Sequence, residues 1–255
     1  EGMAPPDKRL NPEWVRSLYK RGSATTYRKS KDELRYIGMP VGGICCGTVY
    51  VGGDGRLFVW DIFNENQLGA VFKELPISLE TFNVREINNV FGTLYLEPVK
   101  EISRLQQGFA VLIKHNGGTV MKRLHVDDWE EISFEATYPV ATIRYSDKAF
   151  PLELTLQAFS PFIPGDAHNS GLPATIQSVR IHNKGTEPLS VELVGWLENK
   201  LMLNTGKHKR NYSLQNKKTE SSHCKAVLMD CDTADAEIRK APDFGSLAFT
   251  TLAPD

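Results

Sequence analysis

The sequence has almost no net charge, no long apolar run and few cysteines, and each of these absences excludes a class of protein. The 255 residues include 30 Lys and Arg against 31 Asp and Glu, which gives a formal net charge of −1. This balance argues against a nucleic-acid-binding or membrane-surface protein, because both classes concentrate basic residues. No apolar run approaches the roughly 20 residues that span a bilayer, so no transmembrane segment is predicted. The length suits one large all-β domain or two smaller domains.

Cysteine and histidine usage gives no indication of a metal site. The four cysteines are Cys45, Cys46, Cys224 and Cys231, and none of them forms a CxxC pair. A disulfide between the adjacent Cys45 and Cys46 would be strained, so we expect buried free thiols that are inert in apolar surroundings. A bridge from one of this pair to Cys224 or Cys231 is the alternative if the compartment is oxidising. The six histidines form no HExxH or other close pair, and we predict no metal and no cofactor.

The short motifs of nucleophilic and nucleotide-binding enzymes are missing as well. The chain has no GxSxG elbow, no GxGxxG fingerprint and no Gly-Lys-Ser/Thr of a P-loop, which are the signatures of those chemistries. One polar loop, residues 165–171, contains His168 and lies between Pro164 and Pro173. Such a loop can hold a ligand, but we interpret it as a solvated loop.

Paired carboxylates are the remaining catalytic possibility, since glycoside hydrolysis needs two of them. Four acidic residues surround Trp129 in the sequence, namely Asp127, Asp128, Glu130 and Glu131. The sequence cannot set the roughly 5–5.5 Å separation that a retaining pair requires. We therefore interpret this cluster as a solvated acidic turn between two strands.

The N-terminal segment has the signals of one short helix. Asn11, Pro12 and Glu13 are typical of an N-cap, a first helical position and a first-turn acid. Apolar residues at helical spacing follow them, which predicts a helix from Pro12 to about Arg21. The polar residues 23–35 predict a loop.

Beyond this point, nearly every segment has the pattern of a β-strand. Gly52-Gly53-Asp54-Gly55 separates the β-rich runs 48–51 and 56–63, which predicts a hairpin. Apolar or alternating runs predict further strands at 75–82, 92–97, 110–113, 119–126, 131–138, 140–145, 152–159, 174–182, 189–197, 226–229 and 245–252. The segment 200–219 is rich in Lys, Asn and Ser and predicts a long exposed loop.

These strands follow one another without intervening helices, so no parallel sheet is predicted. The predicted fold class is all-β, a large two-sheet antiparallel β-sandwich with a short N-terminal helix. We expect residues 1–30 to form an N-terminal arm with the short helix, and residues 31–255 to form the sandwich domain.

The end of the predicted hairpin gathers one aromatic and three polar residues, Trp60, Asp61, Asn64 and Asn66. A Trp with amide and carboxylate neighbours is typical of a sugar-facing or interface surface. The same group also fits a loop corner anchored by a core Trp, with Asp61 as a turn cap.

Three sequence blocks taken together resemble one known family. The first is YIGMPVGGICCG at residues 36–47, followed by Gly52-Gly53-Asp54-Gly55 and Trp60-Asp61. The second joins Tyr138-Pro139-Val140-Ala141 to Ala158-Phe159-Ser160-Pro161-Phe162-Ile163-Pro164 and Leu172-Pro173-Ala174-Thr175, and the third is Gly195-Trp196-Leu197-Glu198-Asn199. In this order they resemble the N-terminal domain of glycoside hydrolase family 116, which includes non-lysosomal glucosylceramidases and bacterial β-glucosidases.

The resemblance implies a β-sandwich that packs against a C-terminal (α/α)6 helical barrel of the same protein. In the family, the nucleophilic Glu and the acid/base Asp lie on that barrel, so no catalytic residue is carried over to any position here. The resemblance also implies that residues 1–255 do not include the catalytic helical domain and that they support that domain in the parent enzyme. It implies that the parent enzyme binds a β-glucoside carbohydrate. We expect Trp60, Asp61, Asn64 and Asn66 to lie toward the interface with the barrel.

Two alternative hypotheses come from other functional classes. A free-standing carbohydrate-binding module would present exposed aromatic residues in a line or groove. A mutarotase-like sugar epimerase would need a His and a Glu converging in a groove, for which His125 and Glu153 are the candidates. Because the chain starts at Glu1 rather than Met, we expect a processed product or an excised fragment. The resemblance to bacterial forms favours an exported parent.

Overall fold

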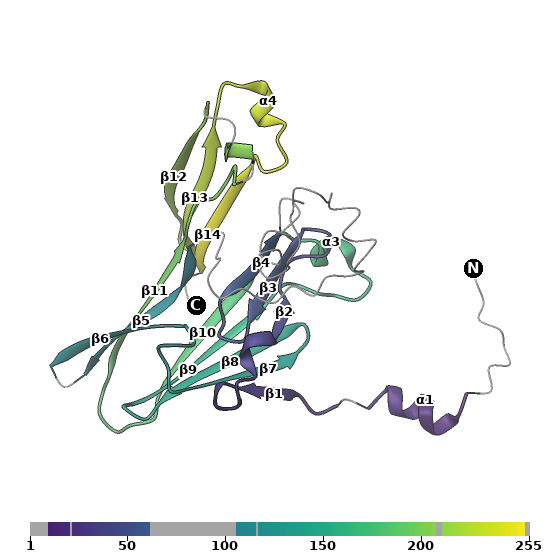
Figure 1. Ribbon diagram of the computed structural model, residues 1–255, viewed down its shortest axis with the longest axis vertical. Helices are drawn as coiled ribbons and strands as arrows, with labels where there is room; N and C mark the ends of the chain where they lie inside the picture. Colours follow the sequence, from purple (N-terminus) through teal and green to yellow (C-terminus); the bar gives the residue numbers. More distant parts are fainter. Residues whose placement is uncertain are drawn as a thin grey trace, which may run out of the picture.

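The computed structural model describes residues 10–20, 22–61, 106–115, 117–203, 205–207 and 211–252. The strands are β1 (Thr25–Arg28), β2 (Gly38–Pro40), β3 (Thr48–Gly52), β4 (Leu57–Asp61), β5 (Gln107–His115), β6 (Gly118–Arg123), β7 (Glu131–Thr137), β8 (Val140–Asp147), β9 (Phe150–Phe159), β10 (Ile176–Asn183), β11 (Ser190–Leu197), β12 (Ser213–Glu220), β13 (Cys224–Asp232) and β14 (Ser246–Leu252). The helices are α1 (Pro12–Leu18), α3 (Ala167–Ser170) and α4 (Ala236–Arg239), with 3-10 turns η1 (Lys29–Lys31), η2 (Leu34–Tyr36) and η4 (Thr205–Lys207). The predicted all-β antiparallel class is confirmed, and hydrogen bonding divides the strands among four sheets (Figure 1).

The largest sheet has five antiparallel strands in the order β1-β7-β8-β9-β10. The alternation seen in the sequence places one side of each strand in the core, as the pleat requires. Ile132 and Phe134 of β7 lie opposite Tyr145 and Ile143 of β8, and all four side chains are fully buried. The core-facing rows of this sheet therefore match the predicted apolar rows.

Two three-stranded sheets, β11-β5-β6 and β2-β3-β4, share the core of the five-stranded sheet. Strand β5 contributes Val111 and Ile113, and β3 contributes Val49 and Val51. The predicted hairpin is confirmed, because β3 pairs antiparallel with β4 across the glycine-rich turn. Burial of apolar surface at roughly 25 cal/mol per Å² is what holds these three sheets together.

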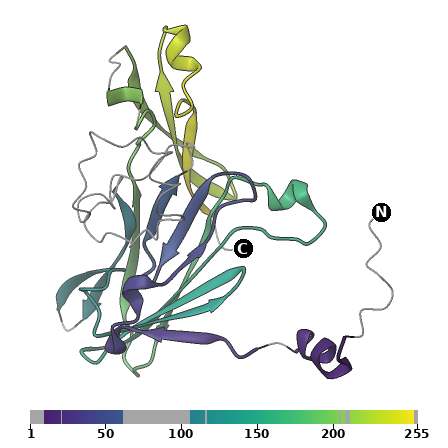
Figure 2. The same cartoon turned by 45° about the vertical axis from the view of Figure 1, so that its right-hand side comes forward.

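The C-terminal strands form a separate sheet, β12-β13-β14, which lies with α4 at one end of the molecule (Figures 1 and 2). Its own small core consists of Leu201, Met202, Cys231 and Ile238. The rings of Phe109 in β5 and Phe249 in β14 have centroids 6.2 Å apart and a tilted orientation. This aromatic contact connects the C-terminal sheet to the sandwich.

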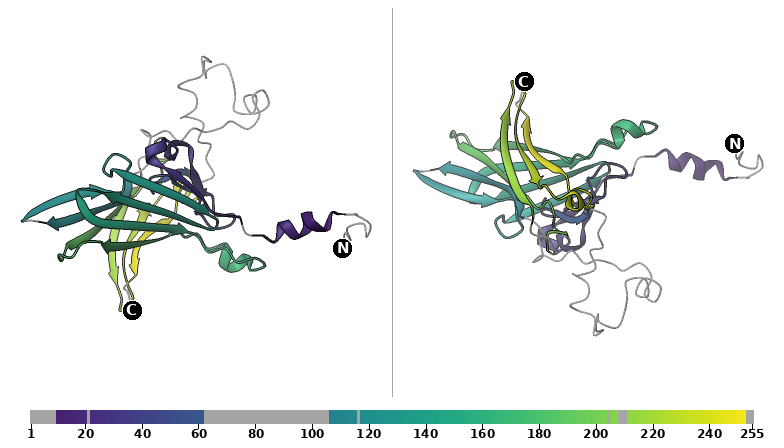
Figure 3. Two further views of the ribbon diagram at one scale, coloured as in Figure 1. Left: turned by 90° about the horizontal axis from the view of Figure 1, so that it is seen from below. Right: turned by 90° about the horizontal axis from the view of Figure 1, so that it is seen from above.

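Helix α1 begins where the sequence predicts, because the side-chain oxygen of Asn11 accepts a hydrogen bond of 2.8 Å from the Glu13 amide. It ends at Leu18, earlier than the predicted Arg21. None of its residues is buried, and it extends away from the strands (Figures 2 and 3). A short helix with no buried residue is marginal in water, which agrees with the early end.

Two predicted loops contain strands. The polar segment 23–35 includes β1, which pairs with β7 at the edge of the largest sheet. The segment 200–219 includes most of β12, which pairs with β13 although every residue of β12 is exposed. The predicted strands at 75–82 and 92–97 lie outside the described residues. Among the residues that the structure describes, no helix has the length and apolar character needed to cross a membrane.

Candidate functional site

The turn between β3 and β4 is buried against β8 instead of projecting into solvent. Asp54 is only 8% exposed, and its carbonyl oxygen accepts a hydrogen bond of 2.8 Å from the Tyr145 hydroxyl. Gly55 has φ +85°, and a Cβ at this position would lie 2.1 Å from the Tyr145 hydroxyl oxygen. Both the backbone conformation and the close approach therefore require glycine here.

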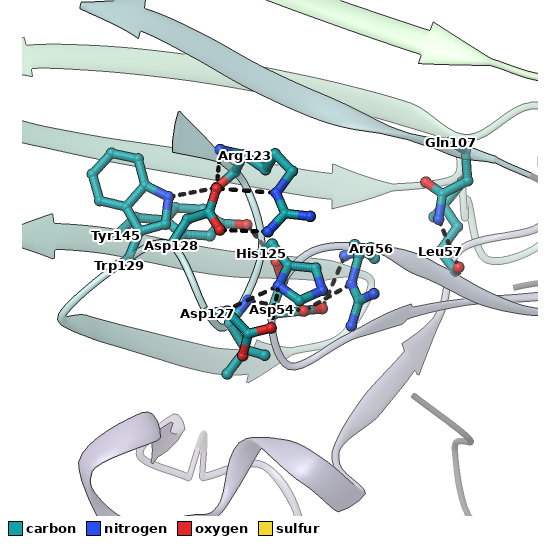
Figure 4. A network of polar contacts seen from close by, with 11 residues as sticks. Asp54, Arg56, Leu57, Gln107, Arg123, His125, Asp127, Asp128, Trp129 and Tyr145 are labelled. Atoms are coloured by element: carbon teal, nitrogen blue, oxygen red, sulfur yellow. Dashed lines mark hydrogen bonds and ion pairs between the residues drawn. The ribbon is translucent and has the colours of Figure 1, made fainter. Parts of the chain in front are cut away.

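Polar contacts join this turn to the segment after β6 (Figure 4). The Asp54 carboxylate accepts hydrogen bonds from Arg56 Nε at 2.8 Å and from the Val126 amide at 3.2 Å. Further along the hairpin, Gln107 of β5 donates a side-chain hydrogen bond of 2.9 Å to the Leu57 carbonyl oxygen. The hairpin is thus fixed at its turn and at the start of β4, which sets the direction in which β4 runs toward Trp60.

The acidic cluster around Trp129 is a hydrogen-bonded turn. Asp128 accepts hydrogen bonds from the Arg123 amide at 2.7 Å and from its guanidinium at 2.7 Å and 3.1 Å. The Trp129 indole, 1% exposed, donates to the Arg123 carbonyl oxygen at 2.8 Å. The Arg123 side-chain hydrogen bond lowers the pKa of Asp128. Arg123 therefore closes the turn, and Asp128 serves as its anchor.

Two other acids near this turn, Glu130 and Asp147, also have cationic partners, whereas Glu131 Oε1 is buried without a hydrogen-bond partner among the described residues. Lys148 pairs with Glu130 at 2.6 Å and lowers the pKa of that carboxyl. Burial raises the pKa of Asp147, but hydrogen bonds from Lys122 and the Ala149 amide outweigh burial and leave it lowered. A general acid in glycoside hydrolysis needs a raised pKa. The pKa shifts at Asp128, Glu130 and Asp147 run in the opposite direction.

Lys122 forms an ion pair with Asp147 in which both side chains are largely buried. Its side chain is 9% exposed and lies over the rings of Trp129 and Phe150, with Nζ 4.7 Å and 5.5 Å from their centroids. These cation–π contacts and the carboxylate offset the cost of removing the ammonium from water. The pair is a packing element of the sandwich.

The two residues considered for an epimerase take part in different contacts. His125 Nδ1 accepts a hydrogen bond of 3.1 Å from the Asp127 amide. Burial, followed by the nearby Arg56 guanidinium, lowers the pKa of His125. Glu153 of β9 pairs with Lys184, and the hydrogen bond from Lys184 lowers the pKa of this carboxyl.

The four residues predicted to face a partner lie at or beyond the end of β4. Trp60 and Asp61 are the last two residues of this strand, and Asp61 lies opposite Thr48 of β3. Their side chains, and all of Asn64 and Asn66, lie outside the described residues. His168 belongs to α3, where the Asp166 side chain caps the helix by accepting a hydrogen bond from the Asn169 amide.

The prediction of buried thiols is wrong for Cys45, which is exposed at φ +63° in the loop between β2 and β3. Cys46 is partly buried and donates from Sγ to the Gly171 carbonyl oxygen at 2.9 Å. Cys231 is buried, and burial raises its pKa. All four cysteines are free. In the described ranges, no three His, Cys, Asp or Glu side chains converge as metal ligands would.

A surface that the sequence patterns did not predict forms where three loops meet. The loop 41–47, the turn at Tyr138-Pro139 and the loop 160–175 line a small hollow between them. The Tyr138–Pro139 peptide bond is cis, and the Tyr138 and Phe162 rings meet edge to face with centroids 5.3 Å apart. The Pro and Gly residues of these three segments indicate turns, but they do not show that the turns lie side by side.

Comparison with known protein families gives one match. The family model described as beta-glucosidase 2, glycosyl-hydrolase family 116 N-term, matches residues 38–253. The match therefore covers the described strands from β2 to β14. No curated protein matches the chain.

Proposed function

Because the chain belongs to the N-terminal domain family of glycoside hydrolase family 116, we propose that it is a non-catalytic domain of a retaining β-glucosidase or glucosylceramidase-like enzyme. In this role it packs on a C-terminal (α/α)6 catalytic domain of the same protein and supports it. The parent enzyme binds the β-glucoside, and the catalytic nucleophile and acid/base lie on the helical domain.

The observation that supports a non-catalytic role is the state of the carboxylates around Trp129. Asp128 is held by Arg123 and Glu130 by Lys148, and the pKa values of both acids are lowered. A retaining glycosidase needs one carboxyl group that keeps its proton near neutral pH beside an ionised nucleophile. Asp128 and Glu130 are therefore ionised, paired carboxylates, which stabilise a fold but donate no proton.

We place the contact with the catalytic domain, in part, at the end of β4. The hairpin is fixed at the Asp54 turn and by Gln107, so β4 delivers Trp60 and Asp61 at a defined position. A buried aromatic anchor beside polar groups is typical of protein interfaces. In the full-length protein, we expect Trp60→Ala to lower hydrolysis of a β-glucoside without changing far-UV circular dichroism.

The non-catalytic role is tested by assaying residues 1–255 alone and the full-length protein on an aryl β-glucoside. We expect hydrolysis only by the full-length protein. Hydrolysis by the isolated chain that Asp128→Asn or Glu130→Gln abolishes would contradict the proposal. Glu237→Gln, which changes an exposed carboxylate paired with Lys240 on α4, is the matched control.

A further inference from the structure

The surface formed by the three loops exposes a group of large apolar side chains. We call it the loop surface, and its members are Ile44, Tyr138, Phe162, Ile163 and Leu172. Their exposed fractions run from 40% for Phe162 to 56% for Tyr138. None of them is charged. Contiguous exposed apolar residues on a soluble domain usually mark an interaction site.

The loops that carry these side chains are held by an internal hydrogen-bond network. The Ser160 hydroxyl lies within hydrogen-bonding distance of the carbonyl oxygens of Val41 and Ala174, at 2.7 Å for Ala174. Thr175 Oγ1 donates to the same Val41 oxygen at 2.7 Å. The Ile44 amide donates to the Ser170 carbonyl oxygen at 2.9 Å, and Ser170 is fully buried.

A close backbone contact completes this network. A Cβ on Gly43 would lie 2.1 Å from the Leu172 carbonyl oxygen, so only glycine lets loop 41–47 lie against loop 160–175. The apolar side chains therefore stand on a constrained base. A surface that is already ordered loses little conformational entropy when a partner covers it.

The size of the hollow in this surface argues against a small-molecule ligand. Its volume is about 30 Å³, and Tyr138, Phe162, Ile44 and prolines provide most of the lining. Small-molecule sites typically measure roughly 300–1,000 Å³ and contain converging polar groups. Here the Ser160 hydroxyl already faces two carbonyl oxygens. The hollow is therefore too small for a sugar ring.

Under the proposed function, the end of β14 is the point from which the polypeptide continues toward the catalytic domain. The family match ends at residue 253, directly after β14. Leu252, the last residue of β14, is 71% exposed. Both views in Figure 3 show the end of β14 and helix α3 of loop 160–175 on the same side of the molecule.

We propose that the loop surface is the docking site for the catalytic domain of the same polypeptide, and that Tyr138 and Phe162 contact that domain. This inference rests on the proposed function and adds the loop surface to the contact placed at the end of β4. It makes the sequence blocks at 36–47, 138–141 and 158–175 parts of one interface.

The test places a photo-crosslinking phenylalanine analogue at position 138 or 162 of the full-length protein. The matched control places it at Met121, which is 63% exposed on β6. We expect crosslinks from positions 138 and 162 to peptides beyond residue 253 of the same molecule, and none from position 121. A second variant, Leu172→Asp, should reduce the crosslink yield from position 162 several-fold, while Met121→Asp should leave it unchanged.

Three results would overturn this inference. The first is a crosslink to a second copy of the chain, and the second is no crosslink from either position 138 or position 162. The third is protection of position 162 by gluco-oligosaccharides, which would identify a sugar subsite. Each of them leaves the proposed function standing if the full-length protein still needs residues 1–255 for hydrolysis. Loss of that requirement would remove the proposed function itself.

Discussion

The hydroxyl of Tyr145 donates a hydrogen bond of 2.8 Å to the carbonyl oxygen of Asp54, which lies 91 residues earlier in the chain. Tyr145 is fully buried, and its ring also packs on Trp129 with centroids 5.6 Å apart. This bond joins the hairpin turn to the centre of the five-stranded sheet. It fixes the strand that leads to Trp60.

Replacing Tyr145 with Phe tests this connection, because it removes only the hydroxyl. The Asp54 carbonyl oxygen would then be buried without this donor, which costs about 1–3 kcal/mol. We expect the free energy of unfolding, measured by urea denaturation, to fall by that amount. Hydrogen exchange should quicken in β3 and β4 and stay unchanged in β12–β14. An equal loss of protection in both regions would contradict a local role.

Gly43→Ala tests the contact between loops 41–47 and 160–175. The added Cβ would meet the Leu172 carbonyl oxygen at 2.1 Å and its carbonyl carbon at 2.8 Å. Because both neighbours are backbone atoms, we expect a loss of about 1–3 kcal/mol in unfolding free energy. Gly245→Ala is the control, since no atom lies within 4 Å of its Cβ position. We expect its effect to stay within about 0.5 kcal/mol.

His125 should make the stability of the fold depend on pH below about 6.5. Burial and the Arg56 guanidinium lower its pKa in the folded state, below the unfolded value of about 6.5. The unfolded chain then binds a proton that the folded chain does not. The contribution is therefore complete above pH 6.5 and is lost as pH falls from there through the folded pKa.

The matching variant is His125→Asn, whose side-chain oxygen can replace Nδ1 as the acceptor for the Asp127 amide. Urea denaturation from pH 8 to pH 5 should show a steeper loss of stability for the natural chain than for this variant. A proton NMR titration that gives His125 a pKa above 6.5 would contradict the prediction.

Lys122→Met tests the buried ion pair. The variant keeps the apolar stem against Trp129 but leaves the Asp147 carboxylate, 15% exposed, without its cation. Breaking a buried pair on one side costs about 3–5 kcal/mol, whereas replacing both partners with apolar residues is often neutral. We therefore expect a large fall in thermal midpoint for Lys122→Met and recovery of most of it in Lys122→Met with Asp147→Leu. Equal midpoints for the single and double variants would show that the charge pair is not responsible.

The strands of the sandwich could be predicted because their apolar rows alternate. In β7, Ile132 and Phe134 are separated by polar residues, and the structure buries this row. Strand β12 could not be predicted in this way, because all of its residues are exposed and no apolar face marks it. The polar edge strand β1 was missed for a similar reason. Helix α1 was predicted too long because its apolar face has no partner among the described residues.

The contacts at the candidate sites depend on residues far apart in the chain. Gly52–Gly55 predicted a turn, but nothing in these four residues indicates that Tyr145 covers them. The loop surface likewise requires Gly43 and Leu172 to lie side by side. The sequence blocks identified the family from residue identity, and the structure shows which of these blocks are neighbours in space.

The supporting role of this domain is tested most directly by deleting residues 1–255 from the full-length enzyme and then adding them back as a separate chain. We expect the deletion to reduce β-glucoside hydrolysis at least about tenfold, which corresponds to roughly 1.4 kcal/mol in transition-state free energy. We expect the added chain to restore part of that activity, and the chain with Phe162→Asp to restore less of it. Full activity and an unchanged thermal midpoint in the deleted enzyme would contradict the supporting role.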